Sequence, residues 1–118
     1  MSLDPELEDL KKQAYEAIDS QDPYSQKEVD AITNLMLIFS MNDIDFKMAE
    51  ALCQRFIQST DKDLSHLAIL CVSHIARVYH RKVNSRIMKE IHQIHQDQTH
   101  QNWGEVDLVL DLLNVIFK

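Results

Sequence analysis

Signals that begin a helix recur along this chain at a nearly constant interval. One series of predicted helices starts near Gln26, Leu64 and Trp103, and a second series starts near Phe46 and Ser85. The interval within each series is about 39 residues, which lies in the range of repeats built from two helices. A chain with this spacing is expected to fold by stacking helical hairpins, each of which covers the apolar faces of its neighbours.

Glycine is almost absent, and its scarcity favours helices over sheets. The chain has one glycine, Gly104, and two prolines, Pro5 and Pro23. Sheets need many tight turns with positive φ, and glycine adopts these turns at the least steric cost. We therefore predict an all-α fold of about six helices, in which antiparallel HEAT-like hairpins stack as a short α-solenoid.

The length of the chain allows one compact domain. Its 118 residues are too few for a second core of ordinary size, and 45% apolar with 26% charged residues is typical of globular proteins. We predict a single all-α domain over residues 1–118. Residues 1–20 are expected to form an acidic cap helix that starts at Asp4-Pro5, and residues 25–118 the HEAT-like repeats.

The most apolar segment is "DLSHLAILCVSHIARVYHRK", residues 63–82. A helix in the middle of a stack contacts neighbours on several sides, so apolar residues cover most of its circumference. We predict a buried stripe through Ile75, another through Val72, and a polar strip that holds Ser73, His74 and Arg77. This segment is too short for a membrane span and is interrupted by charge, so no membrane association is expected.

Two further features predict a cytoplasmic protein. The N-terminal segment "MSLDPELEDLKK" is acidic and lacks the apolar region of a signal peptide. The two cysteines, Cys53 and Cys71, lie in apolar helical patterns and form no CxxC pair, which indicates reduced, buried thiols. We expect the protein to be a monomer or a weak oligomer.

Negative charge is concentrated in the first third of the chain. The net charge is −7, and residues 1–30 hold nine acidic residues against three lysines. This balance argues against direct nucleic-acid binding and favours a basic protein as partner. In the alternative interpretation, the acidic residues only keep a terminal helix soluble. The predicted partner-binding residues surround the first loop: Asp19, Asp22, Glu28 and Asp30.

Three later residues are also candidate partner contacts. His74 and Arg77 either contact a partner or form a structural ion pair with an adjacent helix, for example with Asp107 or Asp111. Trp103 begins the last predicted helix, where it either plugs the end of the core or anchors an interface.

The sequence contains no catalytic constellation. His92 and His95 share one helix face, but a catalytic zinc site needs a third ligand and a general base. There is no HExxH, no GxSxG and no glycine-rich phosphate loop. We therefore predict no enzyme, no catalytic residues, no metal site and no cofactor. A metal-dependent enzyme that uses the histidine-rich segment 66–100 is the third-ranked alternative for the function.

Residues 63–118 resemble small bacterial HEAT-like proteins of polymorphic toxin systems, including those of contact-dependent growth inhibition. The resemblance rests on the HIAR motif at residues 74–77, on the amphipathic helix after it and on the last segment, "VDLVLDLLNVIF". Ser73 stands where the family pattern has a glycine. The resemblance implies an immunity protein that neutralises a cognate toxin domain, expected to be a basic nuclease, in the cytoplasm. The alternative is a HEAT-like scaffold or adaptor without a toxin partner.

Overall fold

The computed structural model describes residues 5–118, and this part of the chain is all-α, with six helices and no strand. The prediction of an all-α fold is confirmed. Pro5 is the first residue of the first helix, whereas the predicted cap Asp4 lies outside the described residues. The helices are α1 (Pro5–Asp19), α2 (Gln26–Met41), α3 (Phe46–Phe56), α4 (Lys62–Tyr79), α5 (Ser85–His95) and α6 (Trp103–Ile116).

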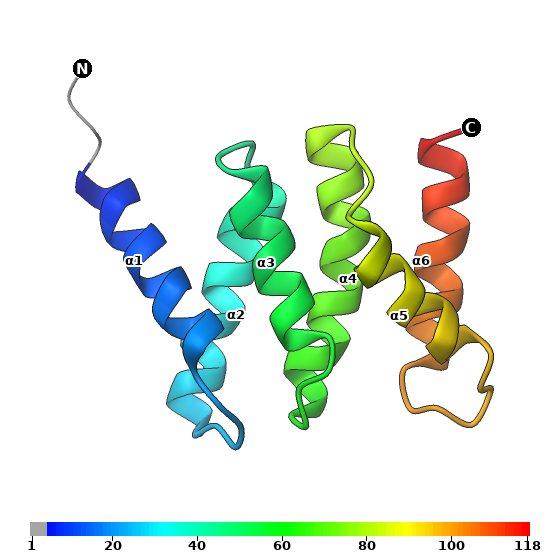
Figure 1. Cartoon of the computed structure of the whole chain (residues 1–118), viewed down its shortest axis with the longest axis horizontal. Helices are drawn as coiled ribbons and strands as arrows, with labels where there is room; N and C mark the ends of the chain where they lie inside the picture. The colour runs from blue at the N-terminus through cyan, green and yellow to red at the C-terminus, as the bar shows by residue number, and fades with distance from the viewer. Residues whose placement is uncertain (1–4) are drawn as a thin grey trace.

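The helices lie in two rows. Figure 1 shows α1, α3 and α5 nearer the viewer and α2, α4 and α6 behind them. Helix α4 packs against α2, α3 and α6, while α1 packs against both α2 and α3. The molecule is flat, with extents of 46 × 35 × 19 Å. Helices α2 and α6 therefore lie on different sides of α4 and do not close into a bundle.

Helix α4 is the centre of the hydrophobic core. Val72 and Ile75, which represent the two predicted apolar stripes, are 1% and 0% exposed. Ser73 was expected on the polar strip but is buried, and its hydroxyl donates to the backbone oxygen of Leu70 at 2.7 Å. An intrahelical bond of this kind satisfies the hydroxyl, so the residue can face the core. Within residues 5–118, no helix is both long and apolar enough to cross a lipid bilayer.

Helices α2 and α3 bury the faces that their apolar periodicity predicts. Each residue predicted to be inward on these two helices is buried, and both cysteines are buried and free, as expected. The inward residues are Val29, Ile32, Leu35, Met36 and Phe39 on α2, and Phe46, Ala49, Leu52, Cys53 and Phe56 on α3.

The start of α2 has the capping box that Ser25 and Glu28 indicate in the sequence. The amide of Glu28 donates to Ser25 Oγ at 3.2 Å, and the amide of Ser25 donates to Glu28 Oε1 at 3.0 Å. Asn84 caps α5 by accepting a hydrogen bond from the amide of Ile87 at 2.9 Å. Side-chain caps of this kind satisfy amides that have no partner inside the helix.

Asn102 and Glu105 have the sequence pattern of a second capping box, but the capping box that this pattern predicts is wrong. Asn102 makes no side-chain cap bond, because its backbone lies at φ −101° and ψ 11°, outside the extended region that capping requires. Its amide group instead donates to Ser65 Oγ on α4 at 3.2 Å, and the residue is buried. Asn102 therefore joins the last loop to the central helix.

The helical pattern that starts at Phe46 predicts an end at Ser59, but α3 ends at Phe56. The chain turns there, because the amide of Ser59 donates to the backbone oxygen of Phe56 at 3.0 Å. The hydroxyl of Ser59 then donates to Asp22 Oδ1, in the first loop, at 2.8 Å. A contact with a loop so distant in sequence ends the helix, and local periodicity does not reveal it.

Tyr79, at the end of α4, fixes the turn between α2 and α3. Its hydroxyl lies 2.7 Å from the backbone oxygens of Phe39 and Asn42, which share its one proton. The amides of Ile44 and Asp45 donate to the same hydroxyl at 3.2 Å. One side chain therefore bonds to four backbone groups of this turn and sets the start of α3 against α4.

Candidate functional site

Three loops lie along one edge of the molecule. The α1–α2, α3–α4 and α5–α6 loops are at the same end of the helices, whereas the α2–α3 and α4–α5 turns are at the other end (Figure 1). This placement follows from the antiparallel order of neighbouring helices. We call residues 19–30, 57–63 and 96–102 the loop edge.

Acidic residues gather on the loop edge. Its three segments hold seven acidic residues against two lysines, Lys27 and Lys62. Asp19, Glu28 and Asp30 were predicted as partner contacts, and all three are exposed. The acidic residues of the two later loops were not among the predicted partner contacts. The antiparallel order of the predicted helices would have placed these loops at the same end of the molecule. These acidic residues are Asp61, Asp63 and Asp97.

Asp22 holds two loops of this edge together. Its carboxylate accepts hydrogen bonds from Ser59 Oγ at 2.8 Å and from the amide of Thr60 at 3.3 Å. Asp22 is half-buried, whereas a residue that served only as a partner contact would be exposed. The structure therefore gives this predicted contact a role in joining the α1–α2 loop to the α3–α4 loop.

Arg55, on α3, holds the first loop in one shape. Its Nη2 donates to the backbone oxygen of Ser20 at 2.7 Å and to the hydroxyl of Tyr24 at 2.9 Å. The guanidinium also lies 4.9 Å from the ring centre of Phe56, a cation–π arrangement. A loop fixed in this way loses little conformational freedom when it binds a partner.

The carboxylate of Glu28 remains ionised to lower pH than an ordinary glutamate. Hydrogen bonds from the backbone and then from the side chain of Ser25 lower the pKa of Glu28. These bonds favour the charged form of the carboxyl group. The exposed acidic surface at the start of α2 is therefore negatively charged over the neutral range.

Replacing Asp22 with Ala should lower the free energy of unfolding by about 1–2 kcal/mol, because it leaves the hydroxyl of Ser59 and the amide of Thr60 without their acceptor. Asp30→Ala is the matched control, since Asp30 is exposed and accepts only from Gln26 on its own helix. The control should change stability by less than about 0.5 kcal/mol. Urea denaturation of both variants measures the difference, and equal effects would contradict the role given to Asp22.

His74 and Arg77 lie away from the loop edge, in the second half of α4. Arg77 Nη2 donates to His74 Nδ1 at 2.9 Å, and burial together with the nearby Arg77 charge lowers the pKa of His74. Asp107, offered as an ion-pair partner for them, instead accepts from His95 Nε2 at 2.9 Å. The structure therefore does not bring His74 and Arg77 together with the predicted acidic contacts.

Trp103 closes the α5–α6 loop at the far end of the loop edge. Its ring stacks on His95 with 5.4 Å between ring centres and 4° between planes. Its Nε1 donates to the backbone oxygen of His95 at 2.8 Å, and the residue is half-buried. These contacts agree with the first alternative for Trp103, a plug at the end of the helical array.

His92 and His95, both on α5, have different neighbours. His95 contacts Trp103 and Asp107, whereas His92 lines a hollow with Phe117 and Lys118 at the C-terminal end of α6. Over the described range 5–118, no group of three or more histidine, cysteine, aspartate or glutamate side chains is placed to hold a metal ion.

No protein-family model, curated protein or solved structure matches this chain. The resemblance of residues 63–118 to toxin-system proteins therefore stays a prediction. The acidic loop edge is the feature from which a function can be argued.

Proposed function

We propose that this protein is an immunity protein whose loop edge binds and neutralises a basic toxin domain, expected to be a nuclease. The observation that carries the proposal is the excess of acidic residues on this edge, seven against two lysines. A nuclease binds phosphate groups and therefore has a basic surface. A rigid acidic edge attracts such a surface at long range and can cover its active site.

The proposed fold family is a HEAT-like stack of three hairpins, α1–α2, α3–α4 and α5–α6. The helices of each pair pack against each other. Helices of the front row begin at Pro5, Phe46 and Ser85, and those of the back row at Gln26, Lys62 and Trp103. These intervals support a repeated hairpin. Helix α1 packs against α2 and α3, which is compatible with its predicted role as the cap at one end of the stack.

The partner surface that we propose has its centre at Asp19, Glu28, Asp30 and the exposed Asp63. Trp103, whose ring is held on His95, closes the far end of the loop edge and is not part of this surface. His74 and Arg77 would belong to a second contact area, because they lie in the later half of α4. The partner can be isolated by using the tagged protein to retrieve binding proteins from a lysate of its own organism. A basic toxin domain, encoded by a neighbouring gene, is the expected result.

Reversing the charge of three exposed acids on the loop edge (Asp19→Lys, Asp30→Lys and Asp63→Lys) should slow association with the toxin domain by about tenfold at low salt. It should also flatten the salt dependence, because charges at the rim of an interface act mainly on the encounter rate. Stopped-flow fluorescence at low and at physiological ionic strength measures both effects.

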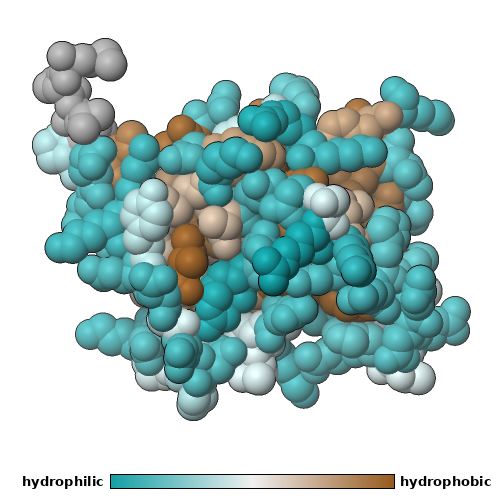
Figure 2. Space-filling model, in the orientation of Figure 1, coloured by the Kyte–Doolittle hydropathy of each residue, from teal (hydrophilic) through white to brown (hydrophobic). Residues whose placement is uncertain are grey.

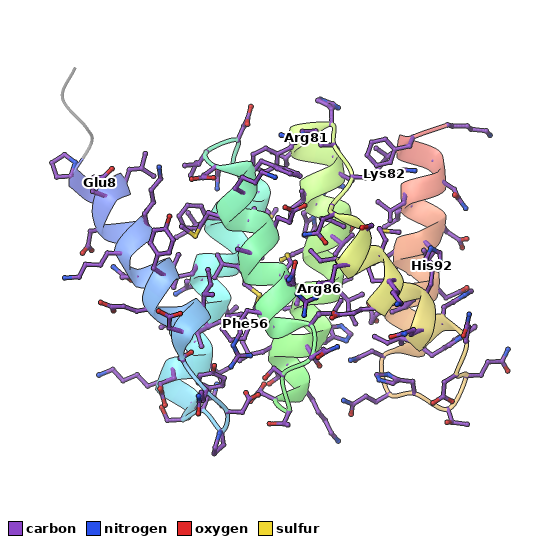
Figure 3. The ribbon with its side chains drawn as sticks, viewed as in Figure 1. Glu8, Phe56, Arg81, Lys82, Arg86 and His92 are labelled. Atoms are coloured by element: carbon purple, nitrogen blue, oxygen red, sulfur yellow. The ribbon has the colours of Figure 1, made fainter. Side chains whose placement is uncertain are left out.

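A second triple variant, Glu8→Lys, Asp43→Lys and Asp111→Lys, is the control. It changes the net charge by the same amount at exposed positions away from the loop edge, and Figure 3 shows Glu8 near the start of α1, at the other end of that helix. Association of this control should slow much less. Equal slowing of the two variants would mean that total charge, and not the loop edge, attracts the partner.

A HEAT-like scaffold or adaptor is the second candidate. An apolar stripe on α6 favours it, because Leu108, Leu112 and Val115 are 48%, 38% and 72% exposed. Exposed apolar residues in a row on one helix are typical of surfaces that contact other proteins. A scaffold would retrieve several proteins at once, and no toxin gene would lie beside its own gene.

A further inference from the structure

Two adjoining hollows lie on the face formed by α1, α3 and α5, which Figure 2 shows as mostly hydrophilic. Their volumes are about 370 and 360 Å³, and Gln58 and Glu90 line both. The first hollow, here called the edge pocket, opens between the α3–α4 and α5–α6 loops and is continuous with the loop edge. Residues of these loops that line it are Ile57, Ser59, Asp97, His100 and Asn102.

Glu90 is a half-buried acid that the fold leaves partly unsatisfied. Its Oε2 is shielded from solvent and has no hydrogen-bond partner among residues 5–118. A shielded acceptor without a donor costs free energy. Burial raises the pKa of Glu90, and the positive charge of Arg86 opposes this effect only in part. Figure 3 shows Arg86 reaching from the first turn of α5 toward α3, on the side of the adjoining hollow.

The lining of the edge pocket favours a cation with an apolar stem. Glu90 and Asp97 supply carboxylates, and Ile57 and Ile94 supply apolar surface. The remaining ionisable group, His100, accepts a hydrogen bond at Nδ1 from the amide of Asn102 at 3.0 Å. No lysine or arginine lines this pocket. The two carboxylates therefore face no permanently charged cation within it.

The volume of the edge pocket fits one long side chain. About 300 Å³ is the lower limit of ordinary small-molecule pockets, so about 370 Å³ leaves room for a side chain but not for a large cofactor. Arginine has five donors in a planar fork and a stem of three methylenes that packs on apolar surface. Carboxylate and amide oxygens at several positions can accept from such a fork.

We propose that the edge pocket receives one arginine side chain of the protein partner, whose guanidinium pairs with Glu90. The source of the arginine rests on the proposed function, whereas binding of a guanidinium is a property of the pocket alone. Arginine residues held in shielded pockets are frequent anchors of interfaces, surrounded by contacts that contribute less. In this arrangement the loop edge attracts the basic partner, and the edge pocket fixes its position.

Agmatine, a guanidinium on a four-carbon stem, is the probe for this pocket. Titration of the ¹⁵N-labelled full chain should give saturable amide shifts around Gln58, Glu90 and Asp97. Glu90→Gln should weaken agmatine binding by about tenfold, because it removes the charge but keeps the shape. Asp111→Asn, which removes an exposed carboxylate on α6, is the control and should leave the affinity unchanged. Butylamine, an analogue of the lysine side chain, should bind more weakly than agmatine.

The pKa of Glu90 provides a second measurement. Saturation with agmatine should lower it by about 1 unit, since a nearby cation favours the carboxylate. Carboxyl ¹³C shifts, followed with and without agmatine, report this change. Other ionisable groups that line the two hollows are present with and without agmatine, so the difference between the two titrations isolates the effect of the ligand. These groups are Asp97 and His100 in the edge pocket, and Lys47, Glu50, Arg55 and Arg86 in the adjoining hollow.

Glu90→Gln should fold as well as the parent chain, because the neutral amide removes a partly shielded charge. If the amide shifts do not saturate with agmatine, or if Glu90→Gln gives the same shifts as the parent chain, then the edge pocket does not bind a guanidinium through Glu90. If the toxin domain binds and Glu90→Gln has no effect on that affinity, the arginine anchor fails and the proposed function stands. If agmatine binds at Glu90 and no toxin domain is retrieved, the pocket stands and the proposed function fails.

Discussion

Replacing Ile75 with Asp should lower the free energy of unfolding by about 3 kcal/mol or more, because it places a carboxylate without a partner in the core. Ile75 is 0% exposed and lies on α4, which packs against α2, α3 and α6. Circular dichroism during urea denaturation measures the change. In the most severe case the variant does not fold at any urea concentration.

Two further substitutions make this experiment specific. Ile75→Val removes one methyl group from the same place and should cost about 0.5–1.5 kcal/mol. Arg77→Asp puts the same carboxylate on an exposed position of α4, where Arg77 bonds only to His74, and should cost less than about 1 kcal/mol. A folded Ile75→Asp protein with the stability of the parent would mean that a different face of α4 is in the core.

Tyr79→Phe should have the second largest effect, about 1–3 kcal/mol, because it removes the hydrogen bonds that one hydroxyl makes with several part-buried or exposed backbone groups. The hydroxyl of Tyr79 contacts four backbone groups in the α2–α3 turn, whereas its ring remains packed on Phe46 at 5.6 Å between centres. The substitution keeps the ring and therefore isolates the hydrogen bonds. Thermal and urea unfolding give the change in stability.

Tyr15→Phe is the control for this hydroxyl. Tyr15 is 62% exposed on α1, so its hydroxyl is hydrated and its removal should change stability by less than about 0.5 kcal/mol. Faster amide exchange of Ile44 and Asp45 in Tyr79→Phe alone should accompany the loss, since their amides donate to the missing oxygen. Unchanged exchange at both amides would argue against the proposed arrangement of the turn.

The helices and their buried faces could be predicted from the sequence because the signals for them are local. Apolar residues three and four positions apart define the inward side of α2 and α3, and Ser25 with Glu28 marks the start of α2. Each of these signals lies within a few residues of the structure that it specifies.

Contacts between distant loops could not be predicted in the same way. Asp22 bonds to Ser59, and Asn102 bonds to Ser65, across 37 residues in each case. Through the first contact Asp22, a predicted partner contact, links two loops. Through the second contact the side chain of Asn102 bonds to α4 and does not cap α6. Glu90 gave no signal in the sequence, because its shielded oxygen depends on how the α3–α4 and α5–α6 loops meet beside α5.

The packing of α5 determines how readily this helix opens. Helix α5 packs mainly on α6, buries only Ile87 and Ile91, and is joined to α3 through hydrogen bonds of its cap Asn84 with Glu50 and Gln54. Helices with few buried residues separate from the native state more readily than the core does. We therefore expect α5 to open more readily than the central helices, whereas α6 stays packed on α4. A ligand in the edge pocket would contact both α5 and the α3–α4 loop and would protect α5 against opening.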